Sequence, residues 1–251
     1  MDPVRNLRSD EIPLAAKMIA TAYEDDPSVA ALIESVDKSG RLEILEKYFA
    51  QLLRLGKKFG RVIAMDHDGA LGGLAIFYPP GTYPPKGFSY WINSIITVMI
   101  LWPKVGLKRL ARLQNISTAL TVAQPLKPHY YLELGCVAKN LHNSGIGTRL
   151  SSHLFSLSDR DNTGVYAETS NKQNLQILKK IGYATANRRQ IYGINFWSLW
   201  RKPKKALALR YAPMRECALS GLRRNCCPAS PKSATPGSYR SHSLPRASCK
   251  R

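Results

Sequence analysis

Apolar residues recur along residues 1–200 with two different periods, and blocks of one period alternate with blocks of the other. A spacing of three to four residues, which is typical of an amphipathic helix, runs through 14–22, 42–53, 88–121, 146–157 and 175–181. Runs rich in β-branched and aromatic residues stand at 4–7, 61–66, 70–78, 130–137, 165–168, 183–185 and 191–200. The pattern predicts the order strand, two helices, two strands, helices, strand, helix, strand, helix and two strands.

Two local features refine this order. The turn His67-Asp68-Gly69 joins two β-rich runs, and its Asp-Gly pair predicts a hairpin. Within 88–121, Lys104, Lys108 and Arg112 are spaced four residues apart and predict one basic helix face, which is either solvated or in contact with phosphate or nucleic acid. The apolar run 91–102 ends at Pro103 and is shorter than the ~20 residues of a membrane span, so we interpret it as a buried or lid helix.

The strand predicted at 130–137 is apolar almost throughout, as expected near the centre of a sheet. Side chains alternate between the two faces of a strand. One face is therefore expected to carry Tyr131, Glu133, Gly135 and Val137. The other is expected to carry Tyr130, Leu132, Leu134 and Cys136.

Charge and cysteine divide the 251 residues into two parts. The net charge is +20, and residues 201–251 hold 13 basic residues against the single acid Glu216. Four of the five cysteines also lie there, and Cys136 is the exception, so neither a disulfide framework nor a metal site is expected. We predict a folded domain over 1–200 and a basic, disordered tail over 201–251. With no signal peptide and no membrane span apparent, we expect a cytoplasmic protein that has no membrane as a partner.

The segment from His142 to Gly147 is a glycine-punctuated turn between a strand and a helix. Backbone N–H groups at the start of a helix lack intrahelical acceptors, and the helix dipole is positive there. Gly145 and Gly147 have no Cβ, so a phosphate can approach the main chain closely. The turn therefore predicts a phosphate-binding site.

Together with a second motif, this turn resembles the GNAT superfamily of acyl-CoA-dependent N-acyltransferases. The family's phosphate loop reads Gln/Arg-x-x-Gly-x-Gly/Ala after an apolar strand, and here His142 takes the first position. Glu168-Thr169-Ser170-Asn171, Asn174-Leu175 and Gly182-Tyr183 resemble the family's second motif. The resemblance covers about residues 3–200. It implies an α/β (α+β) fold with a mixed central sheet of six to seven strands, flanked by helices and splayed at its central strands.

The resemblance also implies roles for individual residues. Backbone groups of Cys136 and Val137 would pair with the pantetheine arm of acetyl-CoA, and Asn174 would contact the same region. The pyrophosphate would be held by backbone N–H groups of Asn143, Ser144, Gly145, Ile146, Gly147 and Thr148. Glu133 would be the general base, with a solvent-facing strand carboxylate as the alternative interpretation, and Glu168 is a second candidate.

The implied reaction is transfer of an acetyl group from acetyl-CoA to a primary amine of a small molecule, by direct attack and without a covalent enzyme intermediate. Two features of the chain resemble the puromycin acetyltransferase-like branch of the family. They are the segment Glu24-Asp25-Asp26-Pro27 and the proline-rich break before the long helices. Those helices would form part of the acceptor pocket or its lid.

Leu178 departs from the family pattern, which often has a tyrosine there as general acid toward the CoA sulfur. A module that binds acyl-CoA with weak or no turnover is therefore the first alternative. A nucleic-acid-associated protein acting through its basic tail is the second. Past Tyr211, Tyr239 is the only aromatic residue in that tail, so we do not expect nucleic acid as a partner. The acceptor and the oligomeric state stay open.

Overall fold

The computed structural model describes residues 3–34 and 36–204. The predicted disordered tail begins at residue 201, but buried Arg201 ends the last strand of the sheet and pairs with Asp159 at 2.7 Å, so this boundary is wrong. The part of the predicted tail from residue 205 onward lies outside the described residues. Seven strands make up one sheet: β1 (Arg5–Asn6), β2 (Arg61–His67), β3 (Ala70–Tyr78), β4 (His129–Val137), β5 (Gly164–Thr169), β6 (Ala184–Ile191) and β7 (Ile194–Arg201). The helices are α1 (Ile12–Tyr23), α2 (Pro27–Ile33), α3 (Lys38–Phe59), α4 (Phe88–Val105), α5 (Leu107–Val122), η1 (Lys139–Leu141), α6 (Ile146–Arg160) and α7 (Lys172–Lys180).

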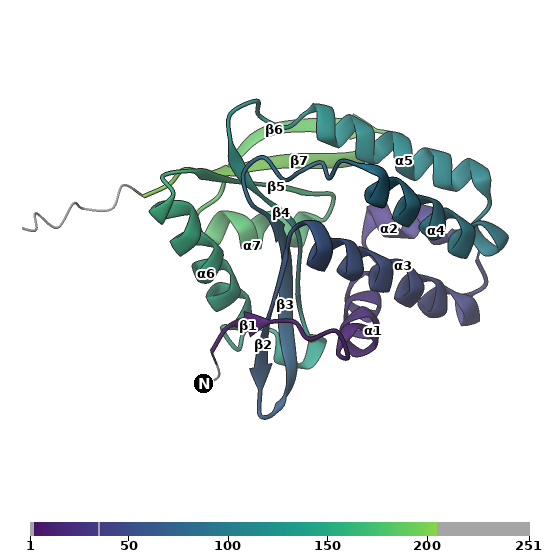
Figure 1. Ribbon diagram of the computed structural model, residues 1–251, viewed down its shortest axis with the longest axis horizontal. Coiled ribbons are helices and arrows are strands. Elements are labelled where there is room, and N and C mark those ends of the chain that lie inside the picture. The colour runs from purple at the N-terminus through teal and green to yellow at the C-terminus, as the bar shows by residue number, and fades with distance from the viewer. Residues whose placement is uncertain (1–2, 35, 205–251) are drawn as a thin grey trace, which may run out of the picture. The chain divides into compact units, whose positions relative to one another are not determined.

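The strands follow the order β1-β2-β3-β4-β5-β7-β6, and the sheet does not close on itself. Only β4 and β5 run parallel, and every other neighbouring pair is antiparallel. Helices α1 to α5 lie on one side of the sheet in Figure 1, and α6 on the other. The mixed seven-stranded sheet flanked by helices confirms the predicted fold class.

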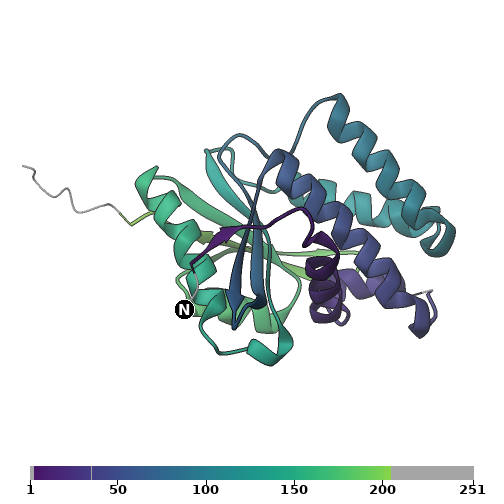
Figure 2. The same ribbon diagram turned by 60° about the horizontal axis from the view of Figure 1, so that its bottom comes forward.

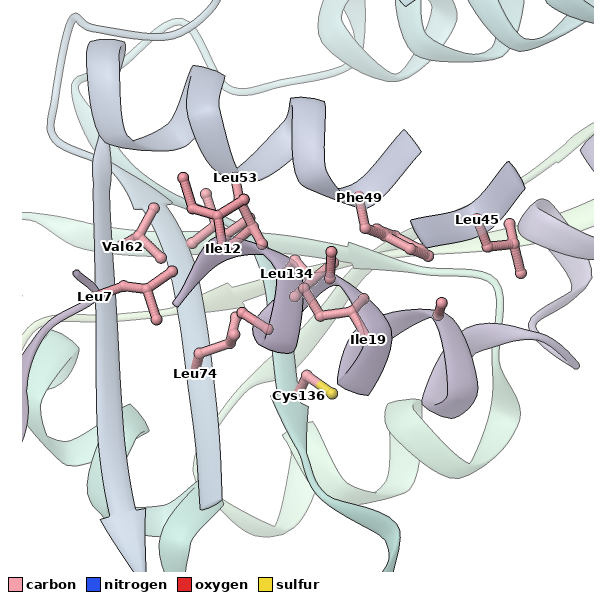
Figure 3. Close-up of a cluster of buried hydrophobic side chains, with 14 of the residues drawn as sticks. Leu7, Ile12, Ile19, Leu45, Phe49, Leu53, Val62, Leu74, Leu134 and Cys136 are labelled. Carbon is pink, nitrogen blue, oxygen red and sulfur yellow. The ribbon is translucent and has the colours of Figure 1, made fainter. Parts of the chain in front are cut away.

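Two hydrophobic clusters form the core, one on each face of the sheet. The larger packs α1, α2, α3, α4 and α5 against the sheet and includes Leu74, Leu134 and Cys136 (Figure 3). The smaller packs α6 and, through partly buried Leu175 and Leu178, α7 against the opposite face. The central strands are thus covered on both sides, which explains their nearly continuous apolar sequence.

The long helical region predicted over 88–121 is broken into two helices at Gly106. This residue has φ +82°, a conformation that glycine adopts readily and that ends a right-handed helix. The expected basic face is therefore wrong. Lys104 belongs to α4 and pairs with Glu43 at 2.8 Å, whereas Arg112 belongs to α5 and donates a hydrogen bond to the Tyr192 carbonyl.

Strand β1 is anchored by a charge network. The Arg5 guanidinium contacts Glu11 at 2.7 Å and Asp66 at 2.6 Å, so one side chain links β1, the start of α1 and the end of β2. The guanidinium lowers the pKa of Glu11 to about 2, against the opposing effect of burial. The network fixes the first strand beside the hairpin.

Candidate functional site

Strands β4 and β5 separate part-way along their length. Their ladder runs from His129 opposite Gly164 to Leu132 opposite Ala167. Beyond these pairs β4 continues to Val137 and β5 to Thr169 without pairing to each other. The sheet is therefore splayed at its central strands, as the resemblance implied.

The register of β4 with β3 decides which backbone groups face this gap. The Ala138 N–H donates to the Gly72 carbonyl at 2.9 Å, so Ala138 and Gly72 form a hydrogen-bonded pair. Such pairs alternate along an antiparallel ladder. The backbone N–H and C=O of Cys136 are therefore directed at Leu74 of β3, and those of Gly135 and Val137 are directed into the gap. This inner edge can accept an extended ligand as if it were an additional strand.

The structure thus separates the two strand residues predicted to bind the pantetheine arm. Val137 offers its backbone to the gap, whereas the backbone of Cys136 belongs to the ladder with β3. Gly135 takes the gap-facing place, and the Tyr23 hydroxyl donates to its carbonyl at 2.8 Å. The Cys136 thiol is buried beneath α1 (Figure 3), and burial raises its pKa to about 12, which excludes a reactive thiolate.

The predicted phosphate loop follows directly after β4. The chain passes through η1 and His142 to Asn143 at φ +68° and Gly145 at φ +87°, and α6 begins at Ile146. The first helical hydrogen bond runs from the Arg149 N–H to the Gly145 carbonyl at 3.1 Å. The N–H groups of the first helical residues, Ile146, Gly147 and Thr148, therefore have no acceptor within the helix.

The side chains of the loop differ in their surroundings. His142, Asn143 and Thr148 are exposed, and Ile146 is buried. The Ser144 hydroxyl is enclosed and finds no hydrogen-bond partner among the described residues. These features favour a site in which the main chain, rather than the side chains, holds an anion.

Two glycines of β3 allow α6 to begin so close to the sheet. A Cβ on Gly72 would lie 2.9 Å from the Ile146 Cδ1, and one on Gly73 would lie 2.7 Å from its Cγ2. A Cβ on Gly147 would meet the Val137 Cγ2 at 3.5 Å, an ordinary contact. The helix start therefore lies against the end of β4, where the gap opens. The Gly-Gly pair inside a strand was the signal that sequence reasoning missed.

A hollow of about 320 Å³ lies beside the same strand end. Leu14, Lys17 and Met18 of α1 line one side, and Ala138, Lys139 and Asn140 line another. The two lysines place positive charge next to the phosphate loop, and sequence reasoning did not single them out.

Asn174 lies on α7, the helix that follows β5. The Asn171 side chain caps this helix by accepting from the Gln173 N–H at 2.8 Å, with the Asn174 N–H at 3.5 Å. The Asn174 side chain is half-buried. Leu178, one turn further along, packs into the smaller hydrophobic cluster with Leu175 and Ile181, so at this position the helix contributes to the core.

Glu133 occupies a β-bulge at the point of splay. Leu132 is opposite Phe77 and Leu134 is opposite Ile76, so Glu133 is an extra residue in β4. The bulge reverses the alternation, and Tyr131, Leu134 and Cys136 all join the larger cluster. The strict alternation predicted for this strand is therefore wrong beyond Glu133.

The carboxyl group of Glu133 is enclosed rather than solvent-facing. Its Oε2 finds no hydrogen-bond partner among the described residues. Burial raises the pKa of Glu133 to about 7, against the lowering effect of a hydrogen bond with Tyr78. A carboxylate with this pKa is well matched to proton transfer near neutral pH.

Glu168 at the end of β5 has a similar environment. Tyr166 donates a hydrogen bond to its Oε1 at 2.8 Å, while Oε2 is enclosed without a partner among the described residues. Burial raises the pKa of Glu168 to about 7, opposed by the Tyr166 hydroxyl and by the Arg189 charge. The structure therefore provides two carboxyl groups able to exchange a proton near neutral pH.

A group of tyrosines connects the two carboxyl groups. The rings of Tyr83 and Tyr131 are 4.3 Å apart between centroids, with Tyr78 5.0 Å from Tyr83 and Tyr166 6.2 Å from Tyr131. The charges of Glu133 and Glu168 both raise the pKa values of Tyr83 and Tyr131, in addition to the larger effect of burial. Both carboxyl groups thus lie near the same rings, of which Tyr78, Tyr131 and Tyr166 are buried in the core.

The site gathers most, but not all, of the predicted residues. The splay brings Val137 next to the start of α6, and the tyrosines place Glu133 and Glu168 around one cluster.

No group of three or more His, Cys, Asp or Glu side chains suited to a metal ion occurs in the described part of the chain. Within the same part, no helix has the length and apolar character needed to cross a membrane.

Solved structures share this architecture. One from Corynebacterium glutamicum, described as histone acetyltransferase HPA2 and related acetyltransferase, superimposes with a TM-score of 0.57 at 15% identity, over 82% of this chain and 98% of that one. Arylalkylamine N-acetyltransferase 2 from Aedes aegypti gives a TM-score of 0.52 at 12% identity, over 81% and 99%. The chain has the fold of the GNAT acetyltransferases. No family model matches the sequence, so the likeness lies in the fold.

Proposed function

We propose that the protein transfers an acetyl group from acetyl-CoA to a primary amine of a small molecule. The observation that carries the proposal is the inner edge of β4. It leads from the enclosed Glu133, past the gap-facing backbone of Gly135 and Val137, to the open N–H groups at the start of α6. An extended ligand with a phosphate at one end fits this edge.

Acetyl-CoA suits these residues and supplies an acetyl thioester when bound. The first-turn N–H groups of α6 would hold its pyrophosphate, and Lys17 and Lys139 add positive charge nearby. The gap-facing groups of Gly135 and Val137 would hydrogen-bond to the pantetheine arm. Asn174, half-buried on the helix after β5, remains the proposed side-chain contact to the same arm.

The acceptor is proposed to be a cationic amine because of what surrounds Glu133 and Glu168. Each carboxylate has an oxygen without a partner among the described residues, and an ammonium group would supply one. Glu133 would accept the ammonium proton, and the resulting neutral amine would bond to the acetyl carbon. The carbon–sulfur bond of the thioester would then break, so that CoA leaves as a thiolate. A gap-facing backbone N–H of β4 polarises the carbonyl oxygen. Glu168 is the second candidate for the base.

The puromycin acetyltransferase-like placement also stays part of the proposal. It is supported by the two helices α4 and α5 inserted between β3 and β4. Tyr83 forms a side-chain hydrogen bond with Thr121 of α5, which connects this helix pair to the tyrosine cluster. The pair would then border the acceptor pocket, in a protein working in the cytoplasm.

Leu178 favours a second candidate function, a module that binds acyl-CoA with weak turnover. Its side chain packs into the hydrophobic cluster under α7 and has no proton to donate. A departing thiolate would then take its proton from water or from another tyrosine.

Two measurements test the proposal. Acetyl-CoA at saturating concentration is expected to raise the melting temperature of the full chain, and no stabilisation would refute the ligand assignment. Acetyl-CoA with a panel of primary amines should then release free CoA thiol in wild type and in Glu34→Gln, an exposed control, but much more slowly in Glu133→Gln. Stabilisation without thiol release from any amine would support the binding module instead.

A further inference from the structure

Helix α4 presents an apolar stripe to the outside. The stripe consists of Phe88, Trp91, Ile92, Ile95, Met99 and Trp102. These residues are spaced three, four and seven apart, so they share one helix face. Phe88 is 82% exposed, Trp91 70% and Met99 66%.

The stripe is additional to the face that holds α4 in place. Leu101 and Val105 are buried and join the larger core cluster, so the helix already has its packing face. Figure 2 shows α4 and α5 as a helix pair at the opposite side of the sheet from α6. A continuous exposed row of aromatic and aliphatic side chains is uncommon on a protein surface and marks an interaction site.

The chain segment that contains the stripe is basic, although Glu43 of α3 pairs with Lys104 near the end of α4 at 2.8 Å. From Gly69 to Leu132 the chain contains no Asp or Glu, but it contains six basic residues: Lys86, Lys104, Lys108, Arg109, Arg112 and Lys127. Exposed Lys86 and Lys108 stand just before and just after α4. At the first turn Lys58 of α3 hydrogen-bonds with Ser89. The surface that covers this stripe must therefore be apolar in its centre and anionic at its margins.

A second copy of the chain does not meet this requirement, because its own stripe has the same basic margins and would repel the first. An anionic bilayer meets it in full. Tryptophan is favoured at the boundary between headgroups and acyl chains, and lysines at the margins reach the lipid phosphates. Trp91 near the start of the stripe and Trp102 at its end are placed to mark that boundary.

We propose that α4 docks on the surface of an anionic lipid bilayer, lying in the interface with its stripe toward the acyl chains. The helix would lie on the membrane rather than cross it, in keeping with its length and composition. This inference is independent of the acetyl transfer proposed above. It gives the exposed apolar stripe a role that the reaction does not require.

The test compares sedimentation of the full chain with two kinds of vesicle, phosphatidylcholine alone and phosphatidylcholine with phosphatidylserine. Wild type is expected to sediment with the anionic vesicles only. The double variant Trp91→Gln/Met99→Gln should bind them at least ~10-fold more weakly, because its apolar contact is lost. Leu14→Gln, which removes an exposed apolar side chain from α1, serves as the matched control.

The basic tail is present in every variant, so binding through the tail alone would leave the double variant equal to wild type and would overturn the proposal. Quenching of tryptophan fluorescence by brominated lipids provides a second readout in wild type, where the stripe tryptophans Trp91 and Trp102 are expected to be quenched. Equal binding to neutral vesicles would refute the role of charge. A dimer in light scattering that the double variant abolishes would assign the stripe to a second copy, and purification with a bound acidic protein would assign it to that partner.

Discussion

Replacing Glu133 with Gln is expected to stabilise the folded protein while it slows the reaction. The carboxyl group has a pKa of about 7 in the fold, against an ordinary value of 4.5. Its raised pKa means that the folded state holds a proton that the unfolded chain gives up. The carboxyl therefore contributes most to stability below pH 4.5, and this contribution is lost as the pH rises through 7.

The size of the effect follows from the two pKa values. Ionising Glu133 in the fold costs on the order of 3 kcal/mol above pH 7, because one pKa unit corresponds to ~1.4 kcal/mol. At pH 5 only the unfolded chain is substantially ionised, and the cost is about 1 kcal/mol. A glutamine of the same shape does not ionise, so Glu133→Gln avoids this cost at every pH.

Urea unfolding of wild type and Glu133→Gln at pH 5 and pH 8, without ligand, measures the difference. We expect the variant to be more stable at both values, with a gap that widens by about 2 kcal/mol between them. The control Glu34→Gln, an exposed substitution, should show no widening. A variant that is no more stable than wild type at pH 8 would mean that the carboxylate has a compensating partner in the fold, and the reasoning would fail.

Three further predictions concern activity, the phosphate loop and the first strand. Below pH 7, where Glu133 becomes protonated, the value of kcat/KM should fall about tenfold per pH unit. A pH-rate profile would detect this fall, with an acceptor whose amine stays fully ionised over the whole pH range as the control for titration of the substrate. Gly73→Ala should lower the free energy of unfolding by about 1–3 kcal/mol, because its Cβ would be 2.7 Å from a methyl group of α6. Gly147→Ala should leave the urea unfolding curve nearly unchanged, since its Cβ would make only an ordinary contact. The same variant should weaken acetyl-CoA binding in calorimetry. Glu11→Gln should lower the free energy of unfolding by about 1–3 kcal/mol at pH 7, because Arg5 loses one of its two carboxylate partners. The difference in urea unfolding between this variant and wild type should vanish as the pH falls from 4.5 toward 2, where Glu11 itself becomes protonated.

Features set by neighbouring residues could be predicted from the sequence. The Asp-Gly hairpin has Asp68 at φ +52° and Gly69 at φ +78°, as the dipeptide indicated. The left-handed Gly145 and the start of α6 at Ile146 likewise follow from a glycine next to an amphipathic repeat. In these segments the conformation depends on a few adjacent residues, and no distant contact alters it.

Features set by pairing between distant segments could not be predicted. The bulge at Glu133 arises from the register of β4 with β3, and a strand pattern read alone assumes strict alternation. The tyrosine cluster joins Tyr78 and Tyr83 to Tyr166 across more than 80 residues of chain, and only the sheet order brings them together. The break at Gly106 is different, because a glycine after Pro103 was a local signal for it.

The two glutamates connect stability to the choice of acceptor. Each has an oxygen without a partner among the described residues, and burial raises the pKa of each to about 7, so ionising either one in the free protein is costly. An ammonium group beside them would offset that cost and would lower both pKa values. A neutral acceptor of the same shape would leave the carboxylates uncompensated. If the proposed function holds, selectivity for a cationic amine would follow from the enclosed carboxylates themselves, and the same enclosure would make Glu133 basic enough to take up the proton.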